Sequence, residues 1–259
     1  MSLQPFRRRD FLSLALLTFV AAAAVPVAAR ASAKATPPAD QQPPLRLLVI
    51  GDSLAQGLAS TLGVRARQLP AFVVMQEGVH STGFTRYHQL DWAAKVTEIL
   101  AKRKIDAVAM WMGLNDFRPM VDPDTRRRYD FATPEWAKLY ADRVDTLIDI
   151  LAKARIPLFW LGLPSLRDAT NNRGMQVIDA LQRERVQQHG ETWISTAELT
   201  SAPDGTYQAF LPDPARGPRR LRADDGAHFT ELGYRIVADQ LLVRMMTRIP
   251  ELKPVLGQE

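Results

Sequence analysis

The chain has 259 residues, and an apolar fraction of 46% with 24% charged residues is typical of a globular protein with one ordinary α/β domain. Cysteine is absent, which excludes disulfide frameworks, cysteine nucleophiles and cysteine-based metal sites. Of the net charge of +5, residues 1–33 carry +3, which leaves +2 for the rest. This small excess argues against nucleic-acid binding, which needs a clustered basic face.

Residues 1–33 predict an export signal of the twin-arginine type. The arginine pair Arg8-Arg9 precedes an apolar stretch from Phe11 to Ala29, and small residues that offer cleavage sites follow. An uncleaved membrane anchor is the alternative, since the apolar run is nearly long enough to span a bilayer. We expect cleavage, no stable membrane insertion afterwards, and a periplasmic or secreted protein.

Residues 34–44 predict a linker, and residues 45–259 predict a single domain. The linker is rich in Ala, Thr, Gln and Pro, and such a segment cannot bury enough apolar surface to order itself. The domain that follows contains no internal repeat.

The domain alternates short apolar strands with helices. Apolar runs predict strands at Leu47–Ile50, Phe72–Met75, Asp106–Trp111, Pro157–Pro164 and Thr192–Ser195. Helical spacing and capping residues predict helices from near Ser53, from Trp92 to Lys104, from Thr133, from Asn172 to Gln188 and from Thr230 to Met246. This alternation implies right-handed crossovers and a parallel sheet covered by helices.

Ser53 follows the first predicted strand in the string Gly51-Asp52-Ser53-Leu54. In open α/β sheets, ligands bind in the crevice outside the carboxyl ends of the strands, so a serine in this turn is placed for chemistry. The alternative is structural, because serine is also among the best helix N-caps.

Other polar turns carry the groups that a serine nucleophile needs. A serine hydroxyl becomes reactive when an imidazole takes its proton, and a carboxylate orients that imidazole. Asp225 lies three residues before His228, so one turn can hold both. Backbone N–H groups of glycine turns and the amide of Asn115 can stabilise an oxyanion. Turn formation alone would equally explain Asp225 and Asn115, and packing or capping would explain His228.

The remaining histidines are expected to be structural. His80 and His88 are polar loop residues, and His189 sits at a helix C-terminus, where a cation is favourable.

Together these segments resemble the SGNH (GDSL-type) hydrolase superfamily, and in particular an exported bacterial branch of unknown function. The matching blocks are Gly51-Asp52-Ser53-Leu54, Gly113-Leu114-Asn115-Asp116 and Asp225-Gly226-Ala227-His228. The glycine block is less regular, and Gly83 is its better candidate. The resemblance spans about Leu45 to Met246, and implies a three-layer α/β/α, flavodoxin-like fold with a central parallel sheet of about five strands.

The resemblance also implies roles for individual residues. Ser53 would be the nucleophile, His228 the general base and then acid, and Asp225 the carboxylate that orients His228. The oxyanion hole would consist of the backbone N–H groups of Ser53 and Gly83 and the side-chain amide of Asn115. This chemistry requires no metal and no organic cofactor.

The expected function is that of a periplasmic serine esterase, which hydrolyses short acyl esters, acetyl foremost, on envelope carbohydrate or peptidoglycan. The partner is therefore an acylated carbohydrate or another small ester, and not a nucleic acid. The alternatives are an O-acetyltransferase acting on a surface polysaccharide and a non-catalytic polysaccharide-binding or assembly factor.

Two long loops carry many arginines, and a basic rim would favour an anionic polymer as substrate. The arginines are Arg118, Arg126, Arg127, Arg128, Arg216, Arg219, Arg220 and Arg222. The alternative is that these arginines are solvated and partly offset by aspartates of the same loops, which are Asp122, Asp124, Asp130, Asp204 and Asp213.

Overall fold

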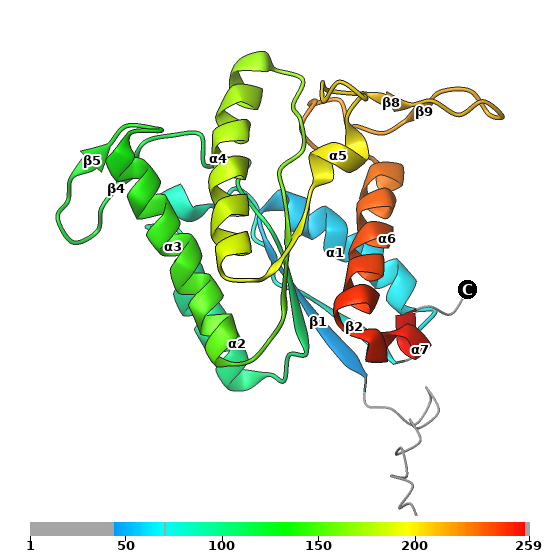
Figure 1. Cartoon of the computed structure of the whole chain (residues 1–259), viewed down its shortest axis with the longest axis horizontal. Helices are drawn as coiled ribbons and strands as arrows, with labels where there is room; N and C mark the ends of the chain where they lie inside the picture. The colour runs from blue at the N-terminus through cyan, green and yellow to red at the C-terminus, as the bar shows by residue number, and fades with distance from the viewer. Residues whose placement is uncertain (1–43, 70, 257–259) are drawn as a thin grey trace, which may run out of the picture. The chain divides into compact units, whose positions relative to one another are not determined.

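The computed structural model describes residues 44–69 and 71–256 (Figure 1). The predicted export signal at 1–33 and the linker at 34–44 lie outside the described residues, except for Pro44.

A five-stranded sheet forms the centre of the domain, with the strands in the order β2-β1-β3-β6-β7. Its strands are β1 (Leu45–Gly51), β2 (Phe72–Gln76), β3 (Ala107–Trp111), β6 (Leu158–Leu161) and β7 (Thr192–Ile194). All neighbouring pairs are parallel. The predicted parallel sheet of about five strands is therefore confirmed. The central strands β1, β3 and β6 are almost completely buried, as their sequences, apolar except for Arg46 of β1, require.

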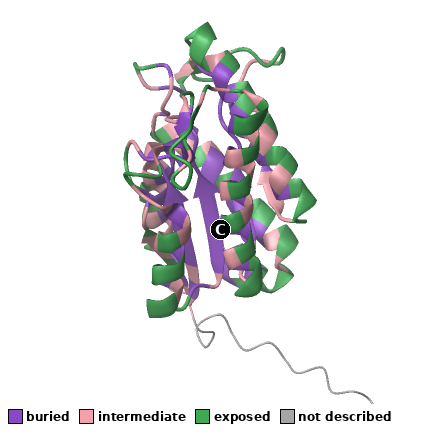
Figure 2. Ribbon diagram, turned by 90° about the vertical axis from the view of Figure 1, so that its left-hand side faces the viewer, coloured by how far each residue is buried: buried purple, intermediate pink, exposed green. Residues whose placement is uncertain are grey.

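Helices cover both faces of the sheet, which makes three layers (Figures 1 and 2). Helices α1 (Ser53–Ala66) and α6 (Glu231–Arg248) lie on one face. The other face carries α2 (Trp92–Lys102), α3 (Pro134–Lys153) and α4 (Ala169–Gln188). Helix α4 begins before the predicted Asn172, because Asp168 caps it by accepting a hydrogen bond from the Asn171 N–H at 2.7 Å. No helix within residues 44–69 and 71–256 is long and apolar enough to cross a membrane.

Several short elements were not predicted, because they are too short to show a hydrophobic period. Two antiparallel hairpins, β4 (Met120–Val121) with β5 (Arg128–Tyr129) and β8 (Phe210–Leu211) with β9 (Arg219–Arg220), project from the two long loops. The other short elements are the 3-10 helices η2 (Phe84–Arg86) and η3 (Pro250–Leu252) and the helices α5 (Thr196–Thr200) and α7 (Lys253–Leu256).

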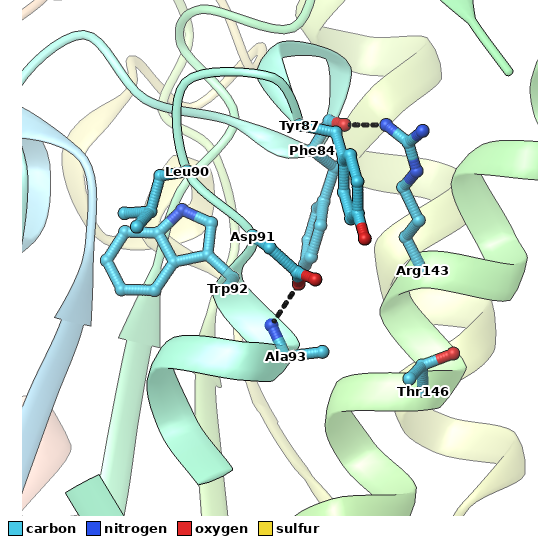
Figure 3. A pocket seen from close by; sticks show the side chains of 8 residues that line it. All are labelled: Phe84, Tyr87, Leu90, Asp91, Trp92, Ala93, Arg143 and Thr146. Carbon is cyan, nitrogen blue, oxygen red and sulfur yellow. Dashed lines mark hydrogen bonds between the residues drawn. The ribbon is translucent and has the colours of Figure 1, made fainter. Parts of the chain in front are cut away.

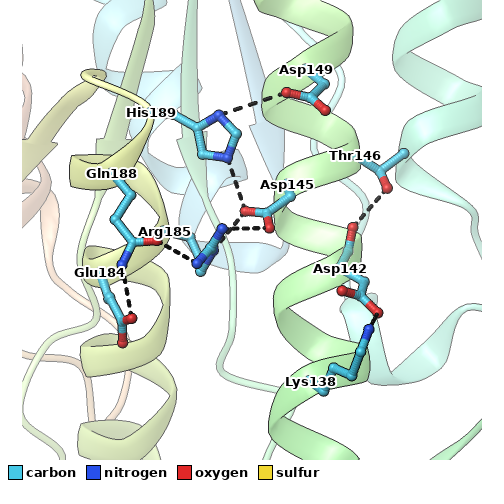
Figure 4. Close-up of polar contacts among 9 residues, drawn as sticks. All are labelled: Lys138, Asp142, Asp145, Thr146, Asp149, Glu184, Arg185, Gln188 and His189. Atoms are coloured by element: carbon cyan, nitrogen blue, oxygen red, sulfur yellow. Dashed lines mark hydrogen bonds and ion pairs between the residues drawn. The ribbon is translucent and has the colours of Figure 1, made fainter.

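A polar cluster on the surface joins α3 to α4 (Figure 4). Arg185 donates to both carboxylate oxygens of Asp145, with N···O distances of 2.8 and 2.7 Å, and His189 lies 3.1 Å from the same carboxylate. His189 also caps the C-terminus of α4. It lines none of the pocket that contains Ser53, as expected for a structural histidine.

Gly51 ends β1 in a conformation that a side chain would strain. Its φ is +133°, and an added Cβ would lie 2.0 Å from the carbonyl oxygen of Trp111. We expect Gly51→Ala to lower the free energy of unfolding by more than about 2 kcal/mol. Gly63→Ala in α1 is the control, because an added Cβ there meets no atom within 4 Å. It should raise the free energy of unfolding by about 0.5–1 kcal/mol. Urea unfolding measures both, and equal midpoints for the two variants would contradict this prediction.

Candidate active site

The turn between β1 and α1 presents Ser53 at the carboxyl end of the sheet. Ser53 is the first residue of α1, and the cap of that helix is Asp52, whose Oδ1 accepts a hydrogen bond from the Leu54 N–H at 2.9 Å. The structural alternative, in which Ser53 caps the helix, is therefore wrong. Because Asp52 does the capping, the Ser53 hydroxyl is free to bond elsewhere.

The structure brings Ser53, His228 and Asp225 together in one hydrogen-bonded chain. The Oγ of Ser53 lies 2.6 Å from Nε2 of His228, and Nδ1 of His228 lies 2.6 Å from Oδ2 of Asp225. The second oxygen of Asp225 accepts from the backbone N–H groups of Ala227 and His228, at 2.8 and 2.9 Å. The turn before α6 thus fixes the carboxylate, and the carboxylate fixes the imidazole.

Asp225 is held in its ionised form. Burial raises its pKa, but hydrogen bonds from the Ala227 N–H and the His228 ring and N–H outweigh burial and lower the pKa to about 2. Asp225 is therefore charged at every pH at which His228 can act as a base. A charged partner at Nδ1 keeps the proton on that nitrogen and leaves Nε2 to accept the proton of Ser53.

Two unused backbone donors lie at the predicted oxyanion positions. The N–H groups of Ser53 and Gly83 donate to no atom of the described residues. The Ser53 N–H also stands at the N-terminus of α1, where the helix dipole favours negative charge. Asn115 donates from Nδ2 to the carbonyl of Thr82 at 2.9 Å. Its second hydrogen bond, 3.4 Å to Asp52 Oδ2, is long and therefore weak, so this is the N–H that an oxyanion would compete for.

Asp52 binds the β1 turn to the β3 turn from inside the protein. Its Oδ2 accepts from the backbone N–H groups of Gly113 and Leu114, at 3.0 and 3.1 Å. Asp52 is fully buried, and burial raises its pKa to about 6 in spite of the hydrogen bonds from Leu54 and Gly113, which lower it. One buried carboxylate therefore sets the distance between Ser53 and Asn115.

Asp116, which follows Asn115 in the β3 turn, binds the loop that carries Gly83. Its buried carboxylate accepts from the N–H groups of Phe84 and Thr85, at 3.2 and 3.0 Å, and from the hydroxyl of Tyr140 at 2.9 Å. Gly83 is extended, so space and not backbone strain requires a glycine there. An added Cβ would lie 2.1 Å from Asp116 Oδ1.

A second anchor ties this loop to α3. Arg143 of α3 donates to the carbonyl of Phe84, and its guanidinium lies 4.6 Å from the centre of the Tyr87 ring (Figure 3). The Gly83 N–H is thereby held between a carboxylate on one element and an arginine on another.

Arg222 is a buried support of the His228 loop and not part of a basic rim. Its side chain is 1% exposed and donates to the carbonyls of Ser165, Ala227 and His228, at 2.9, 2.7 and 3.3 Å. The guanidinium also lies over the Phe229 ring, 4.2 Å from its centre. Burial lowers the pKa of Arg222 to about 10. The expectation that Arg222 faces a substrate is therefore wrong.

A cleft of about 350 Å³ opens beside Ser53 and His228. Its walls include His80, Arg118, Phe117, Asn171 and Met175. His80 was expected to be an ordinary loop residue, and no motif in the sequence indicated its place on the wall of the cleft. Phe117, Asn171 and Met175 carry no local sequence signal, because their elements reach the cleft only through the fold. Within the described residues, no three His, Asp or Glu side chains are grouped so that they could hold a metal ion.

Comparison with known proteins agrees with this geometry at the level of the fold. A GDSL-like lipase from Bacteroides thetaiotaomicron superposes with a TM-score of 0.56 at 11% identity, over 79% of this chain and 89% of its own. An acetyl xylan esterase superposes with a TM-score of 0.53 at 16% sequence identity. A carbohydrate acetylesterase from Sinorhizobium meliloti superposes with a TM-score of 0.52 at 14% identity. Each of these two matches covers 77% of this chain and 99% of the other chain. The chain therefore has the SGNH (GDSL-type) hydrolase fold, as the resemblance implied.

The chain belongs to the family described as protein of unknown function DUF459, whose model matches residues 46–244. No curated protein matches the chain significantly.

The raised pKa of Asp52 predicts a pH-dependent contribution to stability. Between pH 3.8, the ordinary pKa of an aspartate, and about pH 6, the folded protein holds a proton on Asp52 that the unfolded chain has released. The free energy of unfolding of the wild type should therefore fall relative to that of Asp52→Asn as the pH rises from 4 to 7. The expected change is on the order of 3 kcal/mol.

Urea unfolding of both proteins across this pH range makes the measurement. Asp116 and Asp179, whose pKa values are also raised by burial, are present in both and cancel to first order. A stability difference that does not change with pH would contradict the raised pKa of Asp52.

Proposed function

We propose that the protein is a serine esterase that removes short acyl groups, acetyl foremost, from carbohydrate or peptidoglycan in the bacterial periplasm. The observation that carries the proposal is the hydrogen-bond network from Ser53 through His228 to Asp225. Its Ser53 end lies at a cleft, beside unused N–H donors. The periplasmic location rests on the export signal predicted at residues 1–33.

The geometry supports an acyl-enzyme mechanism. His228 Nε2 takes the proton from Ser53 Oγ as the oxygen attacks the ester carbonyl, and Asp225 stabilises the imidazolium that forms. The negative oxygen of the tetrahedral intermediate accepts hydrogen bonds from the N–H groups of Ser53 and Gly83 and from the Asn115 amide. His228 then gives its proton to the leaving alcohol. Water repeats these steps on the acyl-serine and releases the acid.

The size of the cleft supports a short acyl group. At about 350 Å³, the cleft is near the lower end of the range for ligand pockets, roughly 300–1,000 Å³. Apolar side chains of Leu114, Phe117, Leu166 and Met175 line the cleft together with polar ones. Two neighbours in fold are described as an acetyl xylan esterase and a carbohydrate acetylesterase, which agrees with an acetyl ester on a sugar.

Removal of the Ser53 hydroxyl tests the proposal. The protein should release acetate from an aryl acetate and from acetylated glycans, and a serine-reactive phosphonate should label Ser53. Ser53→Ala should lower kcat by more than about 10³-fold and abolish the labelling. Ser60→Ala is the matched control, since Ser60 is an exposed serine of the same helix.

Wild-type protein that neither cleaves short acyl esters nor reacts with the phosphonate would refute the esterase function. Acetate that appears on an added sugar acceptor, instead of in solution, would assign the same residues to acyl transfer.

A further inference from the structure

A second pocket, of about 370 Å³, adjoins the catalytic cleft. Its walls carry four arginines, Arg86, Arg118, Arg126 and Arg128, and we refer to it as the arginine pocket. Arg118 belongs to the walls of both the arginine pocket and the cleft that contains Ser53. The two pockets therefore meet at this one shared side chain.

Three separate segments bring these arginines together. Arg86 ends η2, directly after the loop that holds Gly83, and Arg118 follows the β3 turn that holds Asn115. Arg126 and Arg128 lie on the β4–β5 hairpin, which the structure places on the side of the molecule opposite to β8 and β9 (Figure 1). The arginine pocket is thus built on the segments that form the predicted oxyanion hole.

The positive charges of the arginine pocket are largely without partners. Within the described residues, only Arg128 has a carboxylate within 4.0 Å, and that contact, 3.5 Å to Asp130, joins two exposed side chains. Ion pairs between exposed side chains contribute little to stability. The nearby Asp122 is used by the hairpin, because its carboxylate accepts from the N–H groups of Asp124 and Thr125.

The guanidinium groups of Arg86 and Arg118 also repel each other. Burial, and then the positive charge of Arg86, lower the pKa of Arg118. The Nε of Arg86 is buried and has no hydrogen-bond partner within the described residues. Converging like charges cost free energy, and an anion in the pocket would offset that cost.

We propose that the arginine pocket binds a carboxylate of the substrate, so that the protein acts on acyl esters of an acidic carbohydrate. This inference rests on the proposed esterase function and specifies the substrate of the same site. Guanidinium groups bind carboxylates through paired N–H···O bonds, which gives them both affinity and orientation. A sugar carboxylate in the arginine pocket would place a neighbouring acyl ester over Ser53.

The chemistry of the two pockets favours this occupant over other anions. Nucleic acids carry phosphodiesters and no carboxylic ester for Ser53 to attack. Acidic lipids carry long acyl chains, and the cleft of about 350 Å³ is lined by polar as well as apolar side chains. An acidic carbohydrate supplies both a short acyl ester and a repeating carboxylate.

Acetate release from two polymers tests the inference. The wild type should have a higher kcat/KM on acetylated polygalacturonate than on acetylated glucomannan, which is neutral. The preference should shrink at ionic strength near 1 M, where the Debye length is about 3 Å. In Arg126→Gln/Arg128→Gln, the ratio of the two kcat/KM values should fall by about tenfold or more, mainly through KM for polygalacturonate.

A matched variant separates binding in the arginine pocket from loss of net charge. Arg244→Gln/Arg248→Gln also removes two exposed arginines, both on α6. It should leave the ratio unchanged. An equal fall in both double variants, or no preference in the wild type, would overturn the inference.

Binding to Ser53→Ala separates this inference from the esterase function. Titration calorimetry with polygalacturonate needs no turnover, and should show binding that Arg126→Gln/Arg128→Gln weakens. Such binding without any ester cleavage by the wild type would support carboxylate binding in the arginine pocket and refute the esterase function. Cleavage of both polymers at equal rates, without binding of polygalacturonate, would support the esterase function and refute carboxylate binding in the arginine pocket. Arginine-dependent binding to phosphatidylglycerol vesicles, and not to polygalacturonate, would replace the acidic carbohydrate by a lipid surface.

Discussion

The arrangement of the site depends on one buried carboxylate, that of Asp52. It caps α1, and it accepts the N–H groups of Gly113 and Leu114 from the neighbouring turn. A buried charge is costly, and burial raises the pKa of Asp52 to about 6, but these hydrogen bonds offset part of the cost. Because the same carboxylate holds both turns, the Ser53 hydroxyl and the Asn115 amide keep a fixed separation that neither turn would impose alone.

Each of the other functional groups rests on a comparable buried anchor. Asp116 and Arg143 hold the loop of Gly83 from two sides, and Arg222 holds the carbonyls of Ala227 and His228. Preorganised donors cost no reorganisation when charge develops, which is the main electrostatic advantage of such a site. In the proposed mechanism, the reacting side chains lie at the start of α1 and in loops, and buried polar groups outside the cleft set their positions.

The sheet was predictable because buried parallel strands are continuous apolar runs, and residues 47–50 of β1, β3 and β6 are such runs. Ser53, Asp225 and His228 were predictable because short motifs carry them. The buried residues that anchor the site were not predictable from the sequence. Arg222, for example, donates to the carbonyl of Ser165, which lies far away in the sequence. Arg118, Arg126 and Arg128 of the arginine pocket were predicted only as part of a loose basic rim, and Arg86 was not predicted. Two-residue strands leave no periodic signal, and pairing with aspartates cannot be read from composition.

The central claim is that the N–H groups of Ser53 and Gly83 and the Asn115 amide stabilise the oxyanion that forms when Ser53 attacks an ester. A crystal structure of the protein with a phosphonate bound to Ser53 tests it most directly, because the phosphonyl oxygen occupies the position of the oxyanion. We predict that this oxygen lies within about 2.7–3.1 Å of all three nitrogen atoms. A phosphonyl oxygen that points to solvent, or an adduct on another residue, would contradict the account.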